Sequence, residues 1–555
     1  MNLKFETFYT NSEKLPVQVK SEHSELDRTD FVKKIEKVAD EVFDKIGNPV
    51  SVLQVAAVIE SLGYRHIDCP TEFGKRNIFE LSKDVYRICK LKARKQGRVK
   101  RKFVSLGEKI WRFLKYYFSG IALGLPIATQ IGFIVFTGYS LWAWIKFTEF
   151  QATVVAFGTI LSFIATGGFT QVMGREVTYY LSMGNKFTAR EIAIKLFNYG
   201  FIFSVLIGFA LFVFNFIFEI FPRKFLYIIL AYYFPLSFLW LSTGMIYSAK
   251  RKIAIAVILS IGTLVVIWLH KFKGVSIHIA HFAGLMVSNV LMYLWARYIF
   301  RLKKEEKKLG YVSLKVKRPS VLTYVNSPFF KFGFYYFLIL FLDRIISWTA
   351  YSKGKFYFFW FKTPYELGMD WALLSFGITL AVLEYAVNDF SETLIPVQKN
   401  FYAYRIKSYN FWYLNFYFLK LSFLLVFGVL SIIAVYFVVM RLGEVYQHIK
   451  EVREFFASPI TFKVFYFASL SYLLLAVGLM NNLFFFTLWK PDFGLNSIRI
   501  ALVVDLVVGV IASRLISWEY GVLGFLAGSF VFAVLSTYYM LKFIYTLDYQ
   551  YYSAF

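Results

Sequence analysis

Residues 301–327 read RLKKEEKKLGYVSLKVKRPSVLTYVNS and form the longest polar, basic interval after Tyr116. About six long apolar segments precede this interval and about six follow it. A membrane protein divided in this way is predicted to be two helical bundles joined by a linker. Many transporters rock two such halves against each other around a central path, so the interval also predicts a mechanism.

The composition is that of a membrane protein. Hydrophobic residues make up 58% of the chain and charged residues 17%, and the mean hydropathy is +0.54. A helix that crosses the roughly 30 Å bilayer core needs about 20 apolar residues, and many segments meet that length. The polar start MNLKFETFYTNSEK predicts no cleavable signal peptide.

The formal net charge of +27 has two readings. It could indicate nucleic acid, but Lys and Arg of multi-pass proteins gather in cytoplasmic loops and contact anionic lipid. We therefore expect anionic lipid, and no nucleic acid, as a partner. Similarly, the 21% of aromatic residues would fit either sugar stacking or the aromatic belts of a membrane protein.

Residues 1–116 are expected to form a small helical cytoplasmic domain. Helical periods cover 27–45, 50–62 and 77–92, and the polybasic run LKARKQGRVKRK (91–102) follows them. Such a run next to a membrane helix fixes the N-terminus on the cytoplasmic side. The amphipathic stretch SLGEKIWRFLKYYF (105–118) is predicted to lie along the membrane interface.

The fold class predicted from these segments is an all-α multi-pass membrane protein with about 12 transmembrane helices in two six-helix bundles. The first bundle is assigned to 117–300, the linker to 301–328, and the second bundle with a short cytoplasmic tail to 329–555. The predicted crossings are 118–145, 152–172, 196–221, 225–248, 253–270, 279–300, 329–350, 367–388, 411–440, 462–488, 494–513 and 519–545.

An even number of crossings places both termini in the cytoplasm, and loop charges agree. The predicted inner loops AKRK (249–252), 301–327 and QKNFYAYRIK (398–407) are basic, whereas most outer loops are shorter or less basic. The outer loop SKGKFYFFWFK (352–362), with three lysines, is an exception.

The sequence predicts a protein that is not an enzyme and has no cofactor. It has no Walker A, GxSxG or HExxH motif. His278 and His281 stand three residues apart on one helix but lack a third ligand nearby, so no metal site is expected. Cys69 and Cys89 have no metal-ligand spacing and are interpreted as reduced thiols.

Ionisable residues inside apolar segments are the candidates for the working site, because such groups are costly when they face lipid. Asp343, Arg344 and Asp505 lie deepest, and Glu384, Lys420 and Arg499 lie nearer an interface. Two readings stay open: these residues line or gate a substrate path, or they form internal ion pairs that hold the bundle together.

The end of the second apolar segment carries a further candidate. It reads GGFTQVMGREVTYYLSMGN (167–185) and contains Arg175 and Glu176. Either the pair contacts substrate, or Arg175 anchors an amphipathic turn at lipid phosphates.

Several segments resemble the polysaccharide-export branch of the multidrug/oligosaccharidyl-lipid/polysaccharide (MOP) flippase superfamily, most closely the PelG-like exporters. They are FTQVMGREVTYYLSMGN (169–185), PLSFLWLSTGMIYSAKRKIAI (235–255), FLDRIISW (341–348), YELGMDWALLSFGITLAVLEYAVNDF (365–390) and FIYTLDYQYYSAF (543–555). The likeness covers residues 118–555 in matching order. Arg175-Glu176 depart from it, since the family tends to have threonine–arginine there, and the start of the chain is much longer than the family's.

The resemblance implies a bacterial inner-membrane exporter of an exopolysaccharide that a cytoplasmic glycosyltransferase makes, working with other export subunits. Two alternatives stay open. One is a cation-coupled flippase for a lipid-linked saccharide, or a multidrug antiporter, of the same fold. The other is a membrane scaffold that recruits a synthase and moves nothing.

Overall fold

The computed structural model describes residues 25–95, 105–302, 319–350, 359–400, 406–445 and 458–546, and these ranges are helical with no β-strand. Eleven of the described helices are long and apolar enough to cross a membrane. A twelfth, α12 (Pro319–Thr349), is 31 residues long and carries Lys331, Asp343 and Arg344. The prediction of an all-α multi-pass protein is confirmed.

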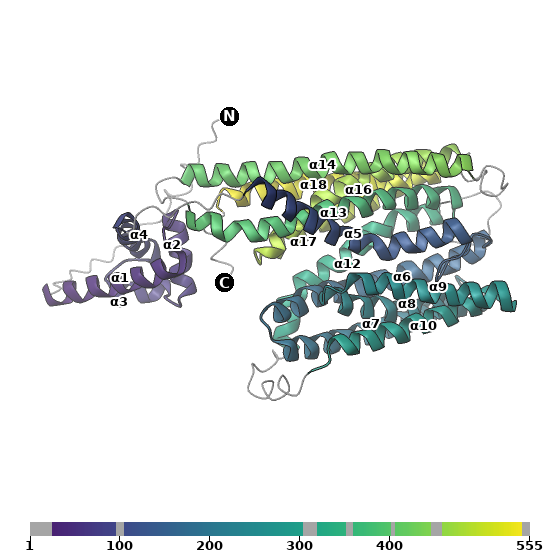
Figure 1. Cartoon of the computed structure of the whole chain (residues 1–555), viewed down its shortest axis with the longest axis horizontal. Helices are drawn as coiled ribbons and strands as arrows, with labels where there is room; N and C mark the ends of the chain where they lie inside the picture. Colours follow the sequence, from purple (N-terminus) through teal and green to yellow (C-terminus); the bar gives the residue numbers. More distant parts are fainter. Residues whose placement is uncertain are drawn as a thin grey trace.

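Four helices precede the membrane helices: α1 (Glu25–Ile46), α2 (Val52–Ser61), the short α3 (Cys69–Phe73) and α4 (Ile78–Lys95). Their apolar faces share a small core that includes Val38, Val42, Ile59 and Leu81. Figure 1 shows this group beyond the ends of two membrane helices of the second half. The 303–318 part of the predicted linker and the 96–104 part of the basic run lie outside the described residues.

The first bundle contains six helices: α5 (Leu106–Thr137), α6 (Glu149–Ser182), α7 (Lys186–Phe218), α8 (Arg223–Ser248), α9 (Lys252–Ile267, continued by the π-helical turn Trp268–Phe272) and α10 (Ile277–Ile299). Residues 105–118, predicted to lie along the membrane interface, form the first turns of α5 and continue directly into its apolar part. Ser105 caps α5 by accepting a hydrogen bond from the Glu108 N–H, which starts the helix ahead of its apolar part.

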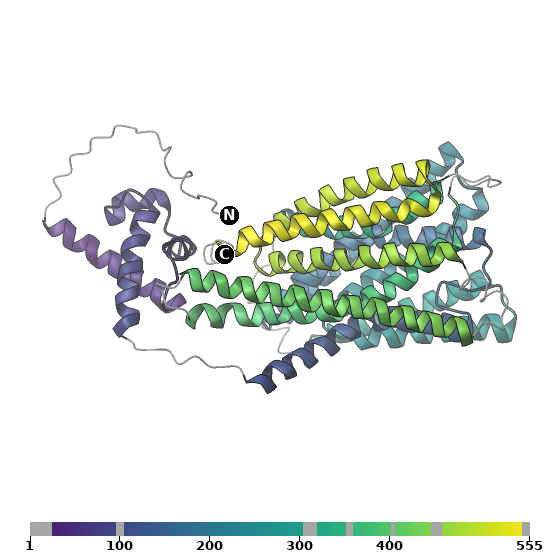
Figure 2. The ribbon, with the colours of Figure 1, turned by 90° about the horizontal axis from the view of Figure 1, so that it is seen from above.

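The second bundle contains α12, α13 (Thr363–Asn400), α14 (Ile406–Val445), α16 (Pro459–Thr487), α17 (Pro491–Leu515) and α18 (Val522–Ile544), with the 3-10 turn Trp518–Gly521 leading into α18. Two large apolar clusters fill the interior: one lies mostly in the second bundle but includes Ile160 and Ile164 of α6, and the other lies mostly in the first bundle but includes Phe329 of α12. Figure 1 shows the second bundle above the first, and in Figure 2 the first bundle lies behind the second.

We call the end that holds the start of α5 and the end of α18 the proximal end, and the opposite end the distal end. The N-terminal helices lie at the proximal end (Figure 2). At this end the Asn410 amide of α14 donates a hydrogen bond to the Tyr545 carbonyl that follows α18. By the loop charges, the proximal end is the predicted cytoplasmic one.

Two helix pairs join the bundles: α5 packs on α13 and α6 on α12. Both pairs meet through glycine. A Cβ on Gly120 of α5 would lie 2.4 Å from the Ala381 Cα of α13, and a Cβ on Gly333 of α12 would lie 2.7 Å from the Gly167 carbonyl oxygen of α6. Small residues let backbones approach this closely in a membrane, where packing drives helix association.

Candidate functional site

Asp343 and Asp505 lie where α12, α17 and α18 meet. Both side chains are fully buried. Glycines at and before the start of α18 make room for them: the Asp343 carbonyl oxygen lies 3.3 Å from the position of a Cβ on Gly521, and Asp505 Oδ1 lies 2.8 Å from one on Gly524. A side chain at Gly524 would displace Asp505.

The two carboxylates are poorly satisfied. Tyr365 donates a hydrogen bond of 2.6 Å to Asp343 Oδ2. Among the described residues, Asp343 Oδ1 and both oxygens of Asp505 have no hydrogen-bond partner. Because burying a bare carboxylate is very costly, two of them together favour a bound proton or small cation. The geometry therefore fits a site that takes up and releases positive charge.

Arg344, next to Asp343 in sequence, has other partners. Its guanidinium is 2.5 Å from Glu366 Oε2 and 3.0 Å from Asp370 Oδ1, both on the first turns of α13. The Trp348 indole N–H donates to the other oxygen of Glu366 at 2.8 Å. Arg344 thus joins α12 to α13 inside the second bundle, as the ion-pair reading of the sequence expects.

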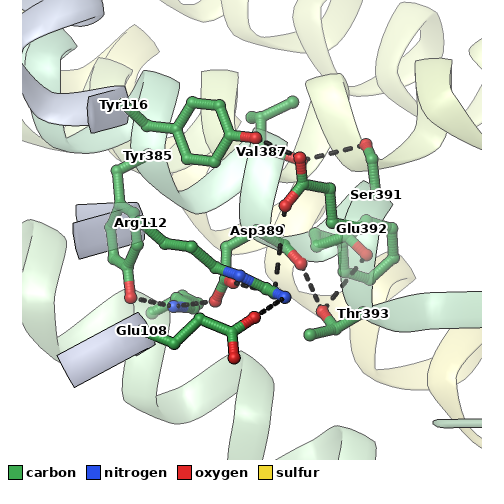
Figure 3. A network of polar contacts seen from close by, with 11 residues as sticks. Glu108, Arg112, Tyr116, Tyr385, Val387, Asp389, Ser391, Glu392 and Thr393 are labelled. Atoms are coloured by element: carbon green, nitrogen blue, oxygen red, sulfur yellow. Dashed lines mark hydrogen bonds and ion pairs between the residues drawn. The ribbon is translucent and has the colours of Figure 1, made fainter. Parts of the chain in front are cut away.

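A second polar cluster lies at the proximal end between α5, α13 and α14 (Figure 3). Arg112 of α5 is 3.8 Å from both Asp389 and Glu392 of α13, and Tyr116 donates a hydrogen bond to Glu392. Lys420 of α14 is 2.5 Å from Asp389. The cluster ties the first bundle to the second through Asp389, which both cations share, and through Glu392.

One turn away, Lys252 and Glu384 form another contact between the bundles. The Lys252 ammonium at the start of α9 is 3.0 Å from Glu384 Oε1 on α13 and also donates to the Ser119 carbonyl of α5. Its side chain is 12% exposed and that of Glu384 is 29% exposed, so water screens this pair less than a surface pair.

Arg175 also joins the bundles. Its guanidinium lies 3.8 Å from the ring centroid of Phe329 on α12 and 4.0 Å from that of Trp489, between α16 and α17. It also contacts Glu176 at 3.0 Å and donates a hydrogen bond to Asn326 of α12. An arginine held between two rings is a strong but reversible contact.

The structure separates the predicted site residues into groups. Asp343 and Asp505 come together deep in the second bundle. Glu384 and Lys420 join the proximal contacts, as do Arg175 and Glu176. Arg344 lies in its own ion pair, and Arg499 is exposed on α17 with its guanidinium 6.0 Å from the Tyr335 ring. Arg499 meets none of the other predicted residues.

Sequence reasoning missed Glu366 and Asp370, which lie four residues apart at the start of α13. A buried arginine such as Arg344 requires a carboxylate on a neighbouring helix, and this spacing puts two on one helix face. Asp389 and Trp489 were also missed, since only the helix contacts reveal them.

The described residues contain no group of three His, Cys, Asp or Glu side chains placed to hold a metal ion. His278 and His281 both contact the Tyr232 hydroxyl, through Nδ1 at 3.2 and 2.8 Å. The tyrosine bridges the two rings inside the first bundle.

The comparisons with known proteins match the fold only. No protein-family model and no curated protein matches the chain. A crystal structure of a mutant of the Vibrio cholerae MATE transporter VcmN aligns with a TM-score of 0.52 and 12% identity, covering 79% of this chain and 98% of that one. The fold is that of the MATE transporters.

Two further structures support the assignment. A MATE protein in the bent conformation gives a TM-score of 0.52 at 10% identity, covering 80% of this chain and all of that one. A MATE protein in the straight conformation gives a TM-score of 0.51 at 12% identity, covering 79% of this chain and 96% of that one. The MATE-like part is therefore about four fifths of the chain.

Proposed function

We propose that this chain is a transporter that exports a saccharide polymer across the bacterial cytoplasmic membrane by alternating access between its two bundles. The observation that carries transport is the contact between the bundles. They meet through polar contacts such as Arg112–Asp389 and Lys252–Glu384 and through the glycine-lined packing of α5 on α13 and of α6 on α12. Such an interface suits two rigid halves that rock.

The saccharide substrate rests on the resemblance to the PelG-like exporters and on aromatic rings at the interface. The Phe163 ring of α6 stacks on the Trp240 ring of the same bundle, with the ring centroids 4.1 Å apart. Its centroid is also 5.5 Å from that of Phe337 and 5.6 Å from that of Phe341, both on α12. Aromatic faces are a common surface for sugar rings. A cytoplasmic glycosyltransferase would supply the polymer, and the helices α1–α4 are the part available to recruit it.

A cation-coupled flippase for a lipid-linked saccharide, or a multidrug antiporter, is the second candidate. It is favoured by the buried Asp343 and Asp505, whose unpartnered oxygens suit proton or sodium binding. Under either candidate, uptake of positive charge at this pair would lower the cost of burying two carboxylates. The charge state would then change how α12, α17 and α18 pack.

The double variant Asp343→Asn, Asp505→Asn tests the role of the pair. We expect normal insertion and loss of polymer secretion, because the amides keep the shape of the site but cannot take up a proton or a cation charge. The matched control is Arg499→Gln, which removes an exposed charge from α17 and should leave secretion intact. Normal secretion from the double variant, at equal protein level, would refute the assignment.

A further inference from the structure

A cavity of about 620 Å³ lies at the distal end of the first bundle, where α7 ends and α8 begins. Phe212, Phe216 and Tyr227 form its apolar wall, and Glu219 and Arg223 supply the charges. None of these residues belongs to the contacts between the bundles. Phe221, which also lines the cavity, packs on Phe359 ahead of α13 with the ring centroids 5.8 Å apart, so the cavity borders the distal contact between the bundles.

The two charges are opposite in sign and do not form an ion pair with each other. Glu219 directly follows α7, and Arg223 is the first residue of α8. Within the described residues, neither side chain has an ion-pair or hydrogen-bond partner, and both are exposed. A pocket with one free anion and one free cation is complementary to a ligand that carries both charges.

The turn that carries these charges is fixed from inside. The buried Asn215 side chain accepts a hydrogen bond of 2.7 Å from the Phe221 N–H and donates one of 3.0 Å to the Phe221 carbonyl. Glu219 has a φ of +47°, a left-handed conformation that is uncommon for residues other than glycine. A non-glycine residue stays in this region only when its surroundings hold it there.

The depth of the cavity identifies the class of ligand. It lies between the ends of two helices that are long and apolar enough to cross the membrane, which is the level of lipid headgroups. Phe216 is 72% exposed and Tyr227 58% exposed, and such side chains fit acyl chains and the interface.

We propose that this cavity binds the headgroup of a zwitterionic phospholipid with a primary amine, such as phosphatidylethanolamine. Its ammonium lies at Glu219, its phosphate at Arg223, and its acyl chains on Phe212 and Phe216. A primary ammonium donates hydrogen bonds to a carboxylate, whereas the trimethylammonium of phosphatidylcholine cannot.

Native mass spectrometry of the purified full chain in detergent tests this site. Dioleoyl phosphatidylethanolamine, phosphatidylcholine and phosphatidylglycerol would be titrated separately. We expect the ethanolamine lipid to bind up to about fivefold more tightly than the choline lipid, as one exposed ion pair allows. Glu219→Gln should abolish that difference, and Arg223→Gln should weaken binding of all three lipids.

Lys224 provides the matched control, because it is exposed beside Arg223 but does not line the cavity. Lys224→Gln should keep the preference for ethanolamine. Glu219→Gly is a second variant that removes the carboxylate and should also lose the preference for ethanolamine. Glycine adopts the left-handed backbone at this position without strain. Three results would overturn the proposal. The first two are that the wild-type chain binds the ethanolamine and choline lipids equally tightly, or that it binds phosphatidylglycerol most tightly. The third is a loss of lipid affinity in Lys224→Gln as large as that in Arg223→Gln.

Discussion

At the level of single residues, the buried charges of the second bundle differ in what surrounds them. Arg344 forms ion pairs with Glu366 and Asp370, whereas the Asp505 carboxylate has no hydrogen-bond partner among the described residues. In the sequence the charges look alike, because each is an ionisable group inside an apolar segment. Which group pairs with a buried charge depends on which helices pack together. The sequence of a single apolar segment does not reveal that packing.

We predict that Arg344→Gln destabilises the second bundle by about 3–5 kcal/mol, because it leaves Glu366 as an uncompensated buried carboxylate. The expected result is a lower melting temperature in detergent and less protein in the membrane. Arg499→Gln is the control, since Arg499 is exposed. Equal melting temperatures for the two variants would contradict the structural role given to Arg344.

The rate at which the two cysteines of the N-terminal helices are alkylated is predicted to depend on pH. Both thiols are buried, and burial raises the pKa of Cys89 to about 12. At pH 8 only about one Cys89 thiol in ten thousand would be ionised, so alkylation should be very slow and should speed up as pH rises. Maleimide labelling with and without denaturant measures this. Prompt labelling of the folded protein would show that the α1–α4 core is not formed.

At the level of elements, apolar runs were sufficient to predict which segments are helical, but not where the helices end. α7 begins at Lys186 rather than near 196, because Asn185 caps it by accepting a hydrogen bond from the Thr188 N–H. α5 ends at Thr137, with Gly138 in the left-handed conformation, although apolar residues continue to 145. Local capping, rather than hydropathy, sets these ends.

The helix α5 packs on α13 of the second bundle as well as on α9 of the first. We predict that Gly120→Ala lowers stability by about 1–3 kcal/mol, because the added Cβ would lie 2.4 Å from the Ala381 backbone. Gly132→Ala on the same helix is the control, since a Cβ there meets nothing within 4 Å. Thermal melting of both variants decides the matter. If Gly120→Ala melts no lower than Gly132→Ala, the α5–α13 contact is wrong.

At the level of the whole molecule, the polar linker at 301–327 predicted two bundles, and the structure has two large apolar clusters, each mostly within one bundle. What the sequence could not predict is how the bundles meet. They contact each other at the proximal end through Arg112, Lys252 and Arg175. At the distal end the Trp360 indole N–H donates a hydrogen bond of 2.6 Å to Glu149. These contacts join residues more than 100 positions apart, so no local pattern records them.

Alternating access requires the proximal contacts to break and re-form in each cycle. Lys252 and Glu384 are the best reporters, because their 3.0 Å ion pair joins α9 of one bundle to α13 of the other. The most direct measurement uses Lys252→Cys with Glu384→Cys in a chain whose Cys69 and Cys89 are replaced by alanine. A membrane-permeant, cleavable bis-maleimide joins the two positions in cells, and secreted polymer is measured before and after cleavage of the linker. Our account predicts that secretion stops on cross-linking and returns on cleavage, while either single cysteine variant treated in the same way keeps secreting. Undiminished secretion from fully cross-linked protein would contradict it.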